Sequence, residues 1–98
     1  MGQIVNGLDE LKSIVEREKR QGKRIVFGNG CFDLLHVGHV RYLKGAKALG
    51  DILIVAVNDD SSVTGLGKRK RAVTPASERA EIIAALEGVD YVILFSEP

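Results

Sequence analysis

The sequence is poor in several features that mark particular protein classes. Its single cysteine, Cys31, excludes an internal disulfide and a zinc site built from several cysteines, which agrees with a reducing compartment. No apolar run approaches the length of about 18 residues that a membrane span needs, and the first residues lack the basic and apolar sections of a signal peptide. We therefore expect a cytoplasmic protein without a membrane partner.

The net charge is also small. Fourteen basic and thirteen acidic residues leave a charge of +1, so no overall field attracts nucleic acid, and any anion site must be local. Hydrophobic residues make up 45% of the 98 residues, which is enough for one compact core. We expect a single domain over residues 1–98, without a nucleic-acid partner.

Hydrophobic periodicity predicts alternating helices and strands. The expected elements are an amphipathic helix over Leu8 to Gln21, a strand over Ile25 to Phe27, a helix over Val40 to Leu49, a strand over Ile52 to Val57, a helix from Pro75 to about Leu86 and a strand over Tyr91 to Phe95. The unbroken apolar run of the second strand is typical of a parallel sheet that is covered on both faces. With right-handed crossovers, the predicted fold is α/β, a Rossmann-like parallel sheet with helices on both faces and a three-strand partial unit.

The segment Gly30 to His39 lies between the first predicted strand and the helix that follows, where α/β proteins bind phosphates. His36 and His39 are three residues apart with Gly38 between them, so both imidazoles can point into one cleft. There they can donate hydrogen bonds to phosphate oxygens beside the positive end of the helix. Two alternatives are that the histidines only cap the helix or pack, and that they bind a metal, although no cysteine pair supports them.

The other residues of this loop have less specific assignments. Cys31 is expected to be a small residue beneath a phosphate rather than a nucleophile, because no partner base is evident. Phe32 is expected in the core. Asp33 either orients a histidine or caps the loop.

Three further groups are site candidates because of their position. Asn58-Asp59-Asp60 follows the second strand, at the sheet edge expected for the histidines, although such residues also form turns. Lys68 to Arg71 is interpreted as a phosphate clamp rather than a nucleic-acid patch, a nuclear localisation signal or a solvated loop, because it lacks aromatic residues for base stacking. Arg79 either reaches the same anion or forms a surface ion pair.

These residues resemble the cytidylyltransferase-like nucleotidyltransferases, whose signature is H-x-G-H. The resemblance covers nearly the whole chain. Within the family, the chain is most similar to the heptose 1-phosphate adenylyltransferases, and next to the glycerol-3-phosphate cytidylyltransferases. The residues that carry the likeness are Gly30 to His39, Arg41-Tyr42-Leu43, Leu49-Gly50-Asp51, Val57 to Asp60, Arg79 and Val89-Asp90.

The resemblance implies nucleotidyl transfer, in which a sugar-phosphate oxygen attacks the α-phosphate of ATP or CTP and pyrophosphate leaves, with Mg²⁺ assisting. It implies catalytic roles for His36, His39 and Lys68, and acceptor contacts for Asp60 and Lys68. The nucleotide-binding residues that it implies are Gly30, Cys31, Phe32, Asp33, His36, Gly38, His39 and Arg79.

The resemblance also implies that the family's C-terminal portion, about one more helix and two strands, is not part of this chain. The three predicted strands would then stand in the order 3-2-1, with the strand over Ile25 to Phe27 as an open edge. We expect a homodimer that covers this edge. We also expect the chain to bind nucleotide weakly and to be inactive alone, and an inactive nucleotide-binding module is the alternative to a transferase.

Overall fold

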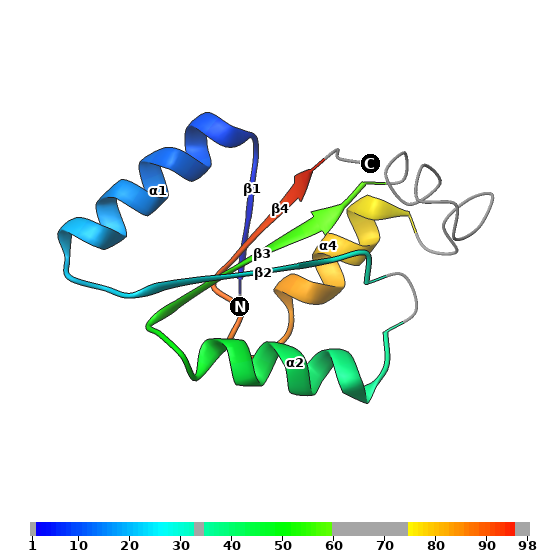
Figure 1. Cartoon of the computed structure of the whole chain (residues 1–98). Helices are drawn as coiled ribbons and strands as arrows, with labels where there is room; N and C mark the ends of the chain where they lie inside the picture. The colour runs from blue at the N-terminus through cyan, green and yellow to red at the C-terminus, as the bar shows by residue number, and fades with distance from the viewer. Residues whose placement is uncertain (1, 33–34, 60–74, 96–98) are drawn as a thin grey trace.

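A computed structural model describes residues 2–32, 35–59 and 75–95 of the chain. Strands and helices alternate along it (Figure 1). The elements are β1 (Gln3–Val5), α1 (Leu8–Arg20), β2 (Ile25–Gly30), α2 (Val37–Lys47), β3 (Ile52–Asn58), α4 (Ala76–Ala84) and β4 (Tyr91–Phe95).

The strands form one sheet in the order β1-β4-β3-β2, and every pair is parallel. Gly30 is in register with Val57, and Asn58 is in register with Phe95. The carboxyl ends of β2, β3 and β4 therefore lie at the same edge of the sheet. This is the edge at which open α/β sheets bind their ligands.

Helices cover both faces of the sheet. Leu53, Val55 and Val57 of β3 are fully buried in one core cluster with residues of α2 and α4. Ala56, whose side chain points the other way, packs against the cluster that contains Ile14 of α1. Burial on both faces, typically worth about 1.5–3 kcal/mol for each large apolar side chain, explains why β3 is an unbroken apolar run.

This architecture confirms the predicted Rossmann-like α/β fold and the predicted order of the last three strands. The prediction of three strands is wrong, because β1 adds a fourth strand beside β4 within the described residues. The sequence signal for β1 is weak, since Gln3–Val5 has three residues, of which only Val5 is buried. Pairing with β4, rather than local propensity, determines this strand.

The prediction for α2 also needs correction. The helix begins at Val37 and not at Val40, so that His39 lies in its first turn and not in a loop. The strand before it extends through Gly30 and not only to Phe27. The segment between them is therefore shorter than the sequence pattern indicated, because the histidines themselves begin the helix.

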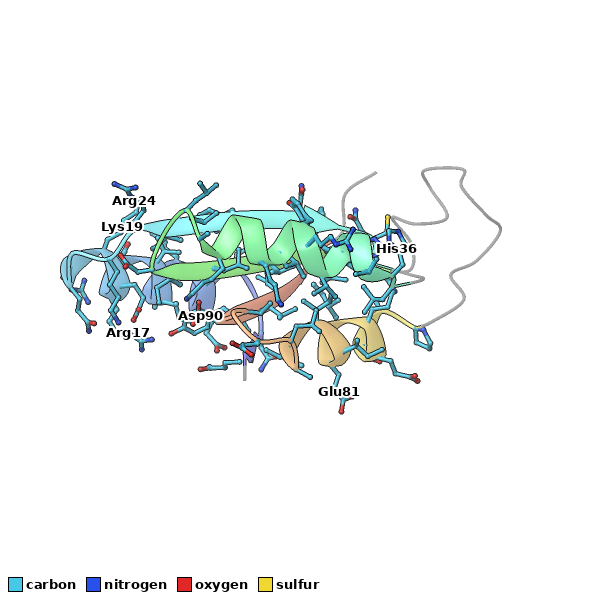
Figure 2. All side chains as sticks on the ribbon, turned by 90° about the horizontal axis from the view of Figure 1, so that it is seen from below. Arg17, Lys19, Arg24, His36, Glu81 and Asp90 are labelled. Carbon is cyan, nitrogen blue, oxygen red and sulfur yellow. The ribbon has the colours of Figure 1, made fainter. Side chains whose placement is uncertain are left out.

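At the amino ends of the strands, a charged network joins α2 to the starts of β3 and β4. The Asp90 carboxylate accepts a hydrogen bond from the Leu53 backbone N–H at 2.8 Å and pairs with the Lys47 ammonium at 2.8 Å. Lys47 also donates to the Asp51 carbonyl at 2.6 Å. These contacts fix the carboxyl end of α2 near the amino ends of the strands. The amino end of the helix therefore points toward the carboxyl ends of the strands. In Figure 2, His36 lies at the amino end of α2, and Asp90 lies toward the other end of the helix.

Within the described residues, β2 is an edge strand, as the sequence predicted. Phe27 on this strand is 59% exposed. In that same part of the chain, no helix is both long enough and apolar enough to cross a membrane.

Truncating Leu53 to alanine should lower the free energy of unfolding by about 2–5 kcal/mol, because the side chain is completely buried and its removal leaves a cavity. Leu49→Ala is the matched control, since Leu49 is 66% exposed and its truncation should change stability by less than about 0.5 kcal/mol. Urea unfolding of both variants measures the difference. Equal effects at the two positions would contradict the core assignment.

Candidate active site

His36 is the N-cap residue of α2. Its backbone is extended, with φ of −143° and ψ of 177°, and its Nδ1 accepts a hydrogen bond from the Gly38 backbone N–H at 3.0 Å. The first N–H groups of a helix have no partner within the helix, so an acceptor here stabilises the helix by about 1 kcal/mol. Imidazole Nδ1 thus performs the task that a serine or aspartate oxygen performs in most helices.

His39, at the third position of the helix, makes a second capping hydrogen bond with His36. Its Nδ1 accepts a hydrogen bond from the His36 backbone N–H at 3.1 Å. The two side chains form a reciprocal capping box. Their ring centroids lie 4.2 Å apart, with the planes tilted by 38°, so the imidazoles sit beside each other at the end of α2.

Gly38 is required by this geometry. A Cβ atom at this position would lie 2.7 Å from Cε1 and 2.9 Å from Nδ1 of His36. Any other residue would therefore displace the His36 ring from its cap. The spacing H-x-G-H follows physically from a helix that is capped twice by histidine.

The caps determine which ring nitrogen carries the proton. Because Nδ1 of each ring accepts a hydrogen bond, the neutral imidazoles of His36 and His39 are protonated at Nε2. Among the described residues, neither Nε2 has a hydrogen-bond partner. The pair therefore presents two N–H donors, which suits phosphate oxygens.

The same caps distinguish the two predicted functions of the pair. An imidazole that binds a metal through Nε2 usually carries a proton on Nδ1 and donates it to an acceptor. Here a proton on either Nδ1 would face the backbone N–H of Gly38 or His36, and the cap would be lost. Capping, which the sequence analysis offered as an alternative to phosphate binding, is compatible with it, because the two interactions use different nitrogens.

Two backbone amides at the start of α2 already have acceptors within the protein. The Gly38 N–H is bound to His36 Nδ1, and the His39 N–H donates to the His36 carbonyl at 3.0 Å. The imidazoles, rather than these two amides, are therefore the donors that a ligand meets at this helix terminus. The partial positive charge of the terminus remains beside them.

Phe32 supports the His39 ring from below. It is 4% exposed, as expected for a core residue, and its ring meets that of His39 edge to face with centroids 5.5 Å apart. Its φ of 53° is a left-handed conformation that costs about 1–2 kcal/mol outside glycine. Gly30 allows this packing, because a Cβ there would lie 3.0 Å from the Phe32 ring.

Arg79 lies in the first turn of α4 and is only 1% exposed. Its Nη1 donates to the Cys31 carbonyl and, at 2.7 Å, to the Asn58 carbonyl. A position on the surface, which one of the two predicted roles required, is therefore wrong for this residue. The predicted contact with an anion stays a prediction.

The structure brings together several of the predicted site residues and leaves others outside its description. Cys31 and Asn58 are half-buried, and Arg79 donates hydrogen bonds to both of their carbonyls at the carboxyl ends of β2 and β3. The Asp59 backbone N–H donates to the Phe95 carbonyl at 2.8 Å, which holds the end of β3 to that of β4. Asp33, Asp60 and the segment Lys68 to Arg71 lie outside the described residues.

Tyr42 is a neighbour of the site to which the sequence analysis gave no role. Its hydroxyl accepts a hydrogen bond from the Asn29 backbone N–H at 3.4 Å, on the edge strand β2. It also lies close to Gly28, where a Cβ would be 3.2 Å from the hydroxyl oxygen. The available signal was its position three residues after His39, on an adjacent part of the helix surface.

The pKa of His39 is lowered from its ordinary value of 6.5, by burial first and by the neighbouring His36 second. Both causes disfavour a positive charge on this ring. The capping hydrogen bond acts in the same direction, because it needs an unprotonated Nδ1. At neutral pH, His39 is therefore a neutral hydrogen-bond donor.

Gly38→Ala should destabilise the chain by about 1–2 kcal/mol, because the new methyl group removes the His36 cap. Gly45→Ala is the matched control within α2, since no atom lies within 4 Å of a Cβ there. That variant should be neutral or stabilising by up to about 1 kcal/mol, as alanine is the better helix former. Thermal unfolding of both variants measures the contrast, and equal signs would contradict the steric role of Gly38.

Acid should weaken the fold through His39. Since the folded pKa lies below 6.5, the neutral ring contributes stability that is complete above pH 6.5 and is lost as the pH falls toward the folded pKa. The urea concentration at the midpoint of unfolding should therefore decrease when the pH is lowered from about 7.5 to about 5.5. His39→Gln keeps a capping acceptor without a titrating group and should show a smaller fall. A wild-type midpoint that rises on acidification would refute this.

Comparison with known proteins supports the interpretation of the H-x-G-H segment. The model of the cytidylyltransferase-like family matches residues 27–97. The bifunctional protein HldE of Geobacter metallireducens is 54% identical over 93 residues, which are 95% of this chain and 19% of that protein. The bifunctional protein HldE of Sulfurimonas denitrificans is 53% identical over 93 residues, 95% of this chain and 20% of that protein. The chain thus spans about a fifth of the length of these curated relatives.

A solved structure agrees with these sequence matches. The lipopolysaccharide core biosynthesis protein from Thermoplasma volcanium superposes with a TM-score of 0.71 and 40% sequence identity, covering 76% of this chain and 59% of its own. The family match extends from β2 through β4 and includes the histidine-capped helix. The resemblance inferred from the sequence is confirmed, and the chain belongs to the cytidylyltransferase-like family.

Proposed function

We propose that this chain is the nucleotide-binding part of a nucleotidyltransferase that transfers a nucleoside monophosphate to a sugar phosphate and releases pyrophosphate. The observation that carries the proposal is the double cap of α2. It directs the Nε2–H groups of His36 and His39 away from the helix, at the sheet edge where α/β proteins bind phosphates.

The chemistry of such a transfer fits these donors. An oxygen of the acceptor attacks the α-phosphorus of the triphosphate, the bond to the bridging oxygen breaks, and pyrophosphate leaves with the bonding electrons. Negative charge moves onto the phosphate oxygens in this step, and pre-positioned N–H donors stabilise it without further rearrangement. His36 and His39 are proposed as these donors. Lys68 is proposed as a further phosphate contact, and Asp60 as an acceptor contact.

The nucleotide and the acceptor are proposed from the relatives. The resemblance seen in the sequence favours ATP as the donor and heptose 1-phosphate as the acceptor, and the names of the similar proteins, HldE and a lipopolysaccharide core biosynthesis protein, are consistent with this choice. Because the chain spans about a fifth of HldE, the activity of that whole protein is only a proposal for this chain. CTP with glycerol 3-phosphate is the second candidate pair.

Mg²⁺ is proposed to accompany the triphosphate. The donor set at α2 consists of imidazole N–H groups, which suit anions, and the described residues contain no cluster of three or more metal-binding side chains. Phosphate oxygens and water are the ligands that Mg²⁺ prefers at nucleotide sites. When bound, the ion would neutralise phosphate charge. Location in the cytoplasm and a homodimer that covers β2 are also proposed.

Replacing His36 or His39 by alanine should reduce turnover about 10²–10³-fold for each donor removed, because charge on the phosphates loses a stabilising hydrogen bond. The assay follows pyrophosphate release from ATP and heptose 1-phosphate by a polypeptide that contains this chain, and calorimetry measures the ATP affinity of the 98-residue chain. Val37→Ala is the control, since Val37 lies between the histidines and is 58% exposed.

Three outcomes distinguish the candidates. Release with CTP and glycerol 3-phosphate, but not with ATP and the heptose, would replace the proposed substrates. ATP binding that depends on both histidines, with no turnover for any acceptor, would indicate a nucleotide-binding module. Unchanged affinity and turnover in both histidine variants would contradict the proposed function.

A further inference from the structure

Arg79 is a buried cation whose role the proposed reaction does not explain. It is 1% exposed and is the largest of the fully buried side chains in the described residues. It extends from α4, which packs on the same sheet face as α2. Burying a guanidinium is costly unless its N–H groups are satisfied, so the partners it binds indicate its function.

Two of those partners are main-chain carbonyls at the ends of neighbouring strands. The Cys31 carbonyl follows directly after β2, and the Asn58 carbonyl is the last of β3. The ladder between these strands is in register as far as Gly30 and Val57. One Nη1 atom therefore bridges strands β2 and β3 just beyond their last paired residues. This bridge restrains the distance between the two strand ends.

A chain of contacts leads from this bridge to the imidazoles. The residue after Cys31 is Phe32, which holds a left-handed backbone conformation and is buried against Gly30. The Phe32 ring contacts His39, and His39 caps His36. A strained residue keeps such a conformation only when its surroundings hold it there. The hydrogen bond from Arg79 to the preceding carbonyl is one such restraint.

We propose that Arg79 is a positioning residue, whose bridge between the Cys31 and Asn58 carbonyls holds Phe32, and through it His39, in the geometry that binds phosphate. The role rests on the proposed function, because the group that it positions is the proposed phosphate donor.

The test compares Arg79→Gln and Arg79→Lys with Ile83→Ala. Ile83 is completely buried on the same helix, so its truncation also weakens the core but leaves both carbonyl bridges intact. Unfolding curves verify that each variant is folded, and the pKa of His39 is measured by proton NMR. The pKa should move toward 6.5 in Arg79→Gln, move less in Arg79→Lys, and stay unchanged in Ile83→Ala.

A double-mutant cycle measures the consequence for ATP affinity by calorimetry. Arg79→Gln should weaken ATP binding about tenfold in the wild-type background and less than twofold in His39→Ala, because the ring it positions is then absent. Equal losses in both backgrounds, or an unchanged His39 pKa in both Arg79 variants, would overturn the proposal. If the wild type binds no ATP while the His39 pKa still responds to Arg79, the proposed function fails and the positioning contact stands.

Discussion

The two hydrogen bonds from backbone N–H groups to the imidazole Nδ1 atoms of His36 and His39 determine the rest of the site. They begin α2 three residues earlier than its apolar pattern indicates. They also place the ring protons on Nε2, pointing the donors outward, and they exclude a side chain at Gly38. One local constraint thus explains the start of a helix, the glycine of the motif and the chemical character of the site. In most helices a capping side chain serves stability alone, whereas here the same rings also carry the proposed phosphate contacts.

The remainder of the fold holds this cap at the correct edge of the sheet. Parallel register brings the carboxyl ends of β2, β3 and β4 together, while Lys47 and Asp90 secure the other end of α2. Phe32 supports the ring of His39, and Arg79 joins the strand ends beneath it. The buried β3 provides a rigid base for these contacts. Precision of this kind is what a reaction needs when it proceeds by positioning and charge stabilisation rather than by a covalent intermediate.

Much of the fold could be predicted from the sequence, because its elements follow strong periodic signals. The apolar run of β3 and the helical spacing of α1 are such signals. β1 could not be predicted, since three residues with one buried side chain carry little local information and their pairing with β4 is a tertiary contact. The position of the glycine and histidine segment at the carboxyl end of a strand could be predicted, whereas its binding of phosphate stays a prediction. The sequence spacing does not reveal that Nδ1 of each histidine caps the helix while Nε2 is left to donate, because this depends on three-dimensional contacts. The burial of Arg79 depends on such contacts as well.

The most direct test of the account is the nitrogen NMR spectrum of the two imidazoles, recorded near neutral pH before and after addition of inorganic triphosphate. Capping predicts that Nδ1 of each ring is an unprotonated hydrogen-bond acceptor in the free chain, and that triphosphate shifts the Nε2 resonances while the Nδ1 atoms stay acceptors. Protons on Nδ1 in the free chain, or Nε2 resonances that do not respond to triphosphate, would contradict the claim that the capped histidines form the phosphate site.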